Sequence, residues 1–569
     1  MENSLKKYDP IMFKRDLIAA LTLFVMLIPQ GMAYAMLAGL PPVMGLYAAT
    51  VPLFVYALVG SSKHLSIGPV AITSLLVFSG VSVYAEPGSS VYITYVIVLA
   101  FMVGGLQLLF GLFKWGVIVK FIPHSVLNGY TSAAAIVIGI SQLNHLLGMD
   151  TGNYLQVHFL LFEVFSRINE IHLLTLAVGL GSILLLILVK KFTPKLPNAL
   201  VAVFLSTIVV ASFRLEGHQL QVIGDVPSGF PGFFVPELTI ETVMMLTPMA
   251  LTIALLGSME SLSIGKAIAK KENYEINPNR EFTALGLSNI VGSFFSSFPV
   301  NGSFSRTAVN HQAGGATQLT AVMTGIFVLI TVTFFTSAFY YIPNAALAAI
   351  IIVAVYKLID FPEMKRLFLV KRFEGWIWVT TFMTTLFIGI QWGIIVGAIF
   401  TLLLIIRKSA KPEIVQLGYV EREKTFRDIS RYPEAITAKK VRILRVDSSL
   451  HFANVAFLDE KLKGLSDVEE AEWLILDMSG VNDIDSVSIQ RLEEVIEYFR
   501  KRQITMLFSN MKGSIRDTVY KVGWKEKYSE QCNHLTLEQL LREKGLRSYF
   551  DPAFNYISSS KERVHDYII

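Results

Sequence analysis

The chain has 569 residues, of which 53% are hydrophobic and only 16% are charged, with a mean hydropathy of +0.53. Soluble chains carry about 25% charged residues. The charges are also uneven, because residues 1–411 hold 25 Lys+Arg and 18 Asp+Glu, whereas residues 412–569 hold 24 and 26. This composition excludes a single soluble globule and indicates a membrane domain followed by a soluble one. The net charge of +5 comes from the membrane part, so it does not indicate a nucleic-acid partner.

Apolar segments of about 20 residues, long enough to cross the ~30 Å hydrocarbon core of a bilayer, recur through the first part. Counting clear and interrupted segments gives fourteen, near 17–37, 43–60, 67–84, 91–113, 123–147, 171–190, 197–213, 243–265, 283–299, 303–314, 316–337, 342–356, 375–390 and 392–406. The third and the tenth look too short or broken to span alone. Broken helices at matching places in two halves are typical of inverted-repeat transporters. The sequence therefore predicts a polytopic α-helical membrane domain.

Basic residues predict the orientation of these segments. With fourteen spans and a cytoplasmic N-terminus, 22 Lys and Arg residues fall on the cytoplasmic side, and only Arg167 and Arg214 fall outside. Such an asymmetry is the positive-inside pattern. We therefore expect a multi-pass protein of the cell membrane (plasma or inner membrane) with both termini in the cytoplasm.

The tail has the pattern of a small α/β domain. Buried-type strands are expected at 441–446, 473–477 and 505–508, with helices near 453–465, 486–502, 512–522 and 535–544. Strands alternating with helices predict a mostly parallel sheet. The expected organisation is a transmembrane domain over 1–408, a linker over 409–438, an α/β domain over 439–546 and a C-terminal extension over 547–569.

Glu260 is the first candidate functional residue. It lies inside 251–264, a run that is otherwise apolar or small. An ionised group at membrane depth costs at least ~2.5–3.5 kcal/mol on insertion scales, so a coupling site for a proton or a cation is one interpretation. The alternative is a carboxyl group near a helix end that reaches toward Lys266.

The turns at 68–71 and 302–306 are the second candidate. A half-helix that begins at membrane depth points free backbone N–H groups and a positive dipole end at an anion. Pro69 suits a first helical position, where its missing N–H sacrifices no hydrogen bond. Arg306 either adds positive charge to this field or simply reaches toward the membrane surface. Taken singly, each turn could also be an ordinary Gly/Pro kink.

Gln30 and Tyr34 lie four residues apart on the first span, so they share one helical face. They either contact a ligand or provide polar packing between helices. No metal site is expected, because Cys532 is the single cysteine and the ten histidines form no ligand cluster. No P-loop, nucleophile–base pair or cofactor motif appears either, which argues against an ATP-driven pump, an enzyme and a bound cofactor.

Several short motifs resemble those of the SulP anion transporters, the sulfate-permease family. They are 29–34 (PQGMAY), 40–47 (LPPVMGLY), 60–63 (GSSK), 67–71 (IGPVA), 302–307 (GSFSRT) and 313–315 (AGG). In the tail, 474–481 (LILDMSGV) with 484–486 (IDS) is similar to a STAS domain. The motifs cover nearly the whole chain in the family's order.

The resemblance implies a 7+7 inverted repeat with a core and a gate domain, and commonly a homodimer. The substrate would lie between the starts of spans three and ten, with alternating access as the mechanism. The residues implied to bind it are Gln30, Tyr34, Val70, Ala71, Ser303, Phe304, Ser305 and Arg306. The last four would supply backbone N–H groups and, from Arg306, positive potential. Glu260 matches the family's acidic position on span eight.

The predictions of the coupling ion and of the substrate depend on finer features of the sequence. Sodium-coupled bicarbonate members resemble one another in having Asp at this position and a hydroxyl residue one turn later, whereas this chain has Glu260 and Ile264. We therefore expect coupling to protons, with sulfate as the imported anion, because 302–307 looks most like sulfate permeases. Two alternatives stay open, namely bicarbonate or a C4-dicarboxylate as the substrate, and sodium as the coupling ion. A membrane anion sensor or scaffold that signals to a cytoplasmic partner of the tail is the alternative of another class.

Overall fold

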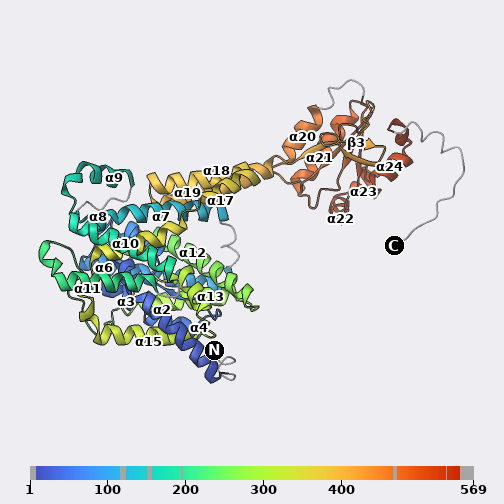
Figure 1. The fold of residues 1–569 in the computed structure, drawn as a ribbon. Coiled ribbons are helices and arrows are strands. Elements are labelled where there is room, and N and C mark those ends of the chain that lie inside the picture. The colour runs from blue at the N-terminus through green and yellow to red at the C-terminus, as the bar shows by residue number, and fades with distance from the viewer. Residues whose placement is uncertain are drawn as a thin grey trace. The chain divides into compact units, whose positions relative to one another are not determined.

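The computed structural model describes residues 8–115, 123–149, 157–193, 197–464, 471–532 and 535–550. The chain divides into two compact units, Met1–Thr401 and Leu402–Ile569. Figure 1 shows the first unit as a set of helices coloured from blue to yellow, and the second as strands and helices in orange and red. Each unit has its own hydrophobic core.

The first unit is almost entirely helical. Its α-helices are α2 (Pro10–Leu37), α3 (Pro42–Tyr47), α4 (Val51–Val59), α5 (Ala71–Val81), α6 (Ser90–Leu112), α7 (His124–Ser141), α8 (Leu143–Leu147), α9 (Val157–Ser166), α10 (Leu173–Phe192), α11 (Asn198–Phe213), α12 (Ile240–Lys271), α13 (Pro278–Ser293), α14 (Phe304–Gln312), α15 (Leu319–Phe334), α16 (Asn344–Val355), α17 (Phe361–Val370), α18 (Arg372–Phe387) and α19 (Ile390–Ala410). Short 3₁₀ turns are η2 (Ile168–Glu170), η3 (Leu215–His218), η4 (Thr336–Phe339) and η5 (Tyr356–Leu358). Each of the fourteen predicted segments overlaps at least one of these helices.

Membrane-spanning character follows from length and composition. Seven helical stretches of the described residues are long and apolar enough to cross a membrane. By contrast, α5 has 11 residues and α14 has 9, which is well short of the ~20 residues that a span needs. These are the third and tenth predicted segments, so the prediction that both are broken is confirmed.

Small residues allow the helices around the site to approach closely. A Cβ atom on Gly104 of α6 would lie 2.6 Å from the backbone nitrogen of Ile290, and one on Gly286 of α13 would lie 2.5 Å from that of Leu108. Glycine at these positions lets α6 and α13 pack backbone to backbone, which is the common way that helices associate in membranes. Helix α6 of this pair also packs against α5 and α12.

The second unit is an α/β domain built on a five-stranded sheet. Its strands are β3 (Ile414–Val420), β4 (Thr425–Asp428), β5 (Val441–Val446), β6 (Trp473–Asp477) and β7 (Thr505–Ser509). The order is β4-β3-β5-β6-β7; β5, β6 and β7 are parallel, and β3 is antiparallel to both of its neighbours, β4 and β5. The helices are α20 (Val455–Gly464), α21 (Ser486–Arg500), α22 (Gly513–Lys521), α23 (Trp524–Lys527), α24 (Leu537–Glu543) and the 3₁₀ turn η6 (Leu546–Tyr549). The predicted strands and helices of the tail are confirmed.

Two predicted boundaries of the tail are wrong. The stretch 409–438 is not only a linker, because it contains β3 and β4, and β3 pairs with β5. The extension predicted over 547–569 begins inside the folded domain, since Phe550 is 1% exposed and its ring meets that of Phe426 at 5.2 Å. Residues 551–569 lie outside the described residues. The predicted boundary after residue 408 falls within α19, which runs across the division between the units.

Candidate functional site

The two short helices begin side by side because the residues before them pair. Strand β1 (Ile67–Gly68) runs antiparallel to β2 (Asn301–Gly302), with Ile67 opposite Gly302 and Gly68 opposite Asn301. This two-stranded contact joins residues from the two halves of the membrane unit. It places the start of α5 and the start of α14 at one point inside the protein.

Asn301 fixes this crossing to the surrounding helices. Its side chain is fully buried; Nδ2 donates to Thr73 Oγ1 at 2.9 Å, and Oδ1 accepts from Gln107 Nε2 at 3.2 Å. Gln107 in turn accepts a 2.8 Å hydrogen bond from Asn289. A buried amide network of this kind is costly when only partly satisfied and rigid when its partners are present. It therefore anchors β2 to α5, α6 and α13.

The start of α5 follows from Gly68 and Pro69. Gly68 has a φ of +141°, a backbone conformation that favours glycine. The helix begins at Ala71 with Val70 as its N-cap, and no side chain caps it. Pro69 therefore precedes the helix instead of occupying its first position, and that prediction is wrong. The N–H groups of the first turn have no partner within the helix.

The start of α14 is partly satisfied by its own residues. Ser303 is the N-cap, and its Oγ accepts from the backbone nitrogen of Arg306 at 3.5 Å. The backbone N–H of Ser303 donates to the carbonyl oxygen of Ser66 at 2.9 Å. It is therefore committed to the protein, contrary to the expectation that it faces a ligand. The N–H groups of Phe304 and Ser305 remain without a partner among the described residues.

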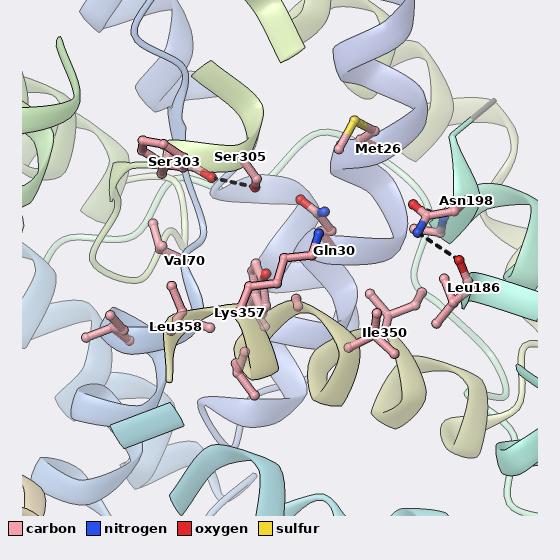
Figure 2. Close-up of a pocket in the computed structure, with 18 of the residues that line it drawn as sticks. Met26, Gln30, Val70, Leu186, Asn198, Ser303, Ser305, Ile350, Lys357 and Leu358 are labelled. Carbon is pink, nitrogen blue, oxygen red and sulfur yellow. Dashed lines mark hydrogen bonds between the residues drawn. The ribbon is translucent and has the colours of Figure 1, made fainter. Parts of the chain in front are cut away.

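A cavity of about 370 Å³ lies in front of these two helix starts. Figure 2 shows Gln30 of α2, Val70, Ser303 and Ser305 around it. All but one of the predicted site residues line this cavity. Those that do are Gln30, Tyr34, Val70, Ala71, Glu260, Ser303, Phe304 and Ser305. Gln30 directly follows Pro29 in the interior of α2. The side-chain oxygen of Gln30 accepts no hydrogen bond from the described residues.

Arg306 is the predicted site residue that does not line this cavity. Its side chain is fully buried, and Nη1 donates to the carbonyl oxygen of Pro69 at 2.8 Å. Nε and Nη2 have no hydrogen-bond partner among the described residues. The guanidinium therefore sits behind the cavity wall and ties α14 to the residues before α5. Any influence on a ligand is through its charge and not through contact.

Glu260 lies in the interior of α12 and faces the cavity. No hydrogen bond or ion pair joins its carboxyl group to another described residue, so the alternative of a contact with Lys266 finds no support in the structure. The same helix approaches β2 closely, because a Cβ atom on Gly257 would lie 2.1 Å from Asn301 Oδ1. The carboxyl group is thus held next to the paired helix starts.

A second cavity, of about 400 Å³, adjoins the first. Five residues line both, namely Ile72, Glu260, Phe304, Lys357 and Leu358. The second is also lined by His124, Asn128 and Asp360. Lys357 and the α16 residues of the first cavity were not predicted as site residues. A lysine that follows an apolar helix is also what the positive-inside rule leads one to expect at the cytoplasmic end of a span. No local pattern could have identified them.

Two short, broken helices that meet at a cavity within a multi-pass helical unit are typical of membrane transporters. Residues 13–381 match the model of the sulfate permease family, and residues 432–536 match that of the STAS domain. The chain belongs to the sulfate permease family and carries a C-terminal STAS domain. The family resemblance stated from the motifs is confirmed.

The chain is similar to individual relatives along most of its length. It is 37% identical to the chloroplastic sulfate transporter 4.1 of Arabidopsis thaliana, over 90% of this chain and 77% of that one. It is 35% identical to the sodium-independent sulfate anion transporter of Bos taurus, over 88% and 84%. The fold is similar to that of the murine anion transporter Slc26a9 in its inward-facing state, with a TM-score of 0.88, 24% identity and coverage of 95% and 93%.

The transmembrane domain of the cyanobacterial bicarbonate transporter BicA is also similar. Its TM-score is 0.59, with 22% identity and coverage of 69% of this chain and 98% of that one. The predicted fold class, a polytopic helical membrane protein with a small α/β domain, is confirmed by these likenesses.

Proposed function

We propose that this protein imports sulfate together with protons by alternating access. The observation that carries the proposal is the cavity between the starts of α5 and α14, which also contains the carboxyl group of Glu260. The names of the relatives from Arabidopsis thaliana and Bos taurus support sulfate as the substrate. Membership of a transporter family supports transport over sensing.

Backbone groups would bind the anion. The N–H groups of Ala71 and Ile72 at the start of α5, and those of Phe304 and Ser305 at the start of α14, have no partner in their helices. A helix N-terminus stabilises a negative charge by up to ~2 kcal/mol in a partly buried geometry. Two starts at one cavity, with the buried cation Arg306 behind them, would offset much of the cost of removing an anion from water. Gln30 and Tyr34 would complete the site from α2.

Glu260 would couple the proton to the anion. Its carboxylate and a dianion in the same cavity repel each other, so the anion binds best when Glu260 is protonated. The residue one turn later, Ile264, lines the second cavity and offers no oxygen to a sodium ion. Protonation would therefore be the event that admits sulfate, and release of the proton would favour release of the anion.

The test is uptake of labelled sulfate into proteoliposomes under an inward proton gradient, with the wild type beside Glu260→Gln. Glu241→Gln is the matched control, because Glu241 is an exposed carboxyl group on the same helix, α12. We expect the gradient to drive accumulation in the wild type and in the control. Glu260→Gln should lose gradient-driven accumulation while it keeps exchange of sulfate across the membrane.

Other outcomes would redirect the proposal. Accumulation driven by a sodium gradient and insensitive to pH would contradict proton coupling. Uptake of bicarbonate or a C4-dicarboxylate instead of sulfate would change the substrate and keep the site. Binding without flux of any anion would favour a membrane sensor acting through the STAS domain. A homodimer in the cell membrane, with both termini in the cytoplasm and a cytoplasmic partner for the STAS domain, remains our expectation.

A further inference from the structure

We propose that Lys357 is a residue of the anion site that selects dianions over monoanions. This inference rests on the proposed function, since it concerns how the same cavity recognises sulfate. Lys357 lies in η5, directly after α16, and lines both cavities. Figure 2 shows its side chain extending toward Gln30 of α2.

The charges in the lining support a direct role. Among the described residues that line the first cavity, Lys357 is the one basic residue and Glu260 is the one acidic residue. Arg306, the cation expected from the sequence, is buried behind the wall with Nη1 on the carbonyl of Pro69. The positive charge that an anion can touch in this cavity is therefore that of Lys357.

Lys357 forms no ion pair among the described residues, although Asp360 lies three positions along the chain. Asp360 is engaged elsewhere, because its Oδ1 accepts from the backbone nitrogen of Glu363 at 3.0 Å and caps α17. Lys190 of α10, a second cation, lies beside Lys357. An anion bound at Lys357 would relieve the repulsion between the two ammonium groups.

A fixed cation discriminates by charge in a way that can be measured. The Coulomb energy between Lys357 and an anion is proportional to the charge of that anion. Removing the lysine charge should therefore cost a dianion twice the binding free energy that it costs a monoanion of the same shape. Expressed in affinity, the fold loss for the dianion should be near the square of the loss for the monoanion.

The experiment compares sulfate with methanesulfonate, in which a methyl group replaces one charged oxygen. Binding of each to the purified full chain is measured for the wild type, Lys357→Gln and Lys357→Arg. Lys365→Gln is the matched control, because Lys365 is an exposed lysine on α17 that lines neither cavity. For Lys357→Gln we expect sulfate to weaken about thirtyfold and methanesulfonate about fivefold. Lys357→Arg and Lys365→Gln should each stay within about threefold of the wild type for both anions.

The outcomes separate this proposal from the proposed function. Equal fold losses for the two anions in Lys357→Gln, or none, would overturn the role of Lys357 even if the wild type transports sulfate. A wild type that binds methanesulfonate and not sulfate would overturn the sulfate proposal, and dianion selection with it. Retained methanesulfonate binding in Lys357→Gln shows that the variant is folded, so a loss of sulfate binding alone is attributable to charge.

Discussion

Arg306 of α14 donates from Nη1 to the carbonyl oxygen of Pro69, 2.8 Å away, and this bond joins the two helix starts that flank the cavity. The guanidinium is fully buried, and its Nε and Nη2 have no partner among the described residues. Burying a charge without full pairing is costly. We therefore expect this buried cation to act through the positive field that it exerts at the cavity beyond Pro69.

Two substitutions of Arg306 distinguish the effect of its charge from the effect of its hydrogen bond. Arg306→Gln removes the charge, so we expect sulfate affinity to fall at least about tenfold, or by ~1.4 kcal/mol. Arg306→Lys keeps the charge but not the planar donor geometry, so it should keep most of the affinity while lowering the thermal midpoint. Sulfate titrations and melting curves of the purified protein measure the two effects. Wild-type affinity in Arg306→Gln, with only a lower midpoint, would show that the residue is structural.

Substitution of Gly45 tests how closely α3 must approach α2. A Cβ atom on Gly45 would lie 1.9 Å from the carbonyl oxygen of Gly31, so Gly45→Ala must push the two helices apart. Overpacking of this kind costs ~1–3 kcal/mol, and we expect a clearly lower thermal midpoint. Gly181→Ala on α10 is the control, because among the described residues no atom outside its own helix turn lies within 4 Å of the added methyl group. It should be neutral or stabilising, since alanine is favoured over glycine in a helix. Equal midpoints for both variants would contradict the close contact.

Cys532 reports on the folding of the STAS domain. Burial raises the pKa of its thiol to about 12, and it is the single cysteine of the chain. A raised pKa means that the stabilisation is complete below the unfolded pKa of about 8.5 and is lost as the pH rises toward the folded value. At pH 8 iodoacetamide should therefore label the native protein at least about a thousandfold more slowly than the unfolded chain. Fast labelling of the native protein would show that this part of the domain is open.

The membrane fold was predictable because apolar length and glycine–proline breaks are local signals. Segments 67–84 and 303–314 could be recognised as broken from Gly68-Pro69 and from residues 299–302 alone. The pairing of Gly68 with Asn301 is a long-range contact that no local pattern contains. The stretch 409–438 resembles a linker in sequence because it is rich in charged residues, although β3 lies inside the sheet between β4 and β5.

Most of the predicted residues line the cavity, but the directions of their side chains were not predictable. On a helix each successive side chain turns by about 100°, so the direction of Arg306 depends on how α14 packs and not on its neighbours in sequence. The structure turns Ser305 toward the cavity and Arg306 behind the wall. Lys357 was counted only as a cytoplasmic lysine, because its reach into the cavity depends on the packing of α16 beside α2.

The most direct test of this account is to locate a bound dianion in an experimental structure. Selenate has the charge and shape of sulfate, and the anomalous signal of selenium identifies it without ambiguity. We predict one selenate between the starts of α5 and α14, within hydrogen-bonding distance of the backbone nitrogens of Phe304 and Ser305 and near Lys357. A selenate bound elsewhere in the membrane unit, with the first cavity empty under conditions of active transport, would contradict the account.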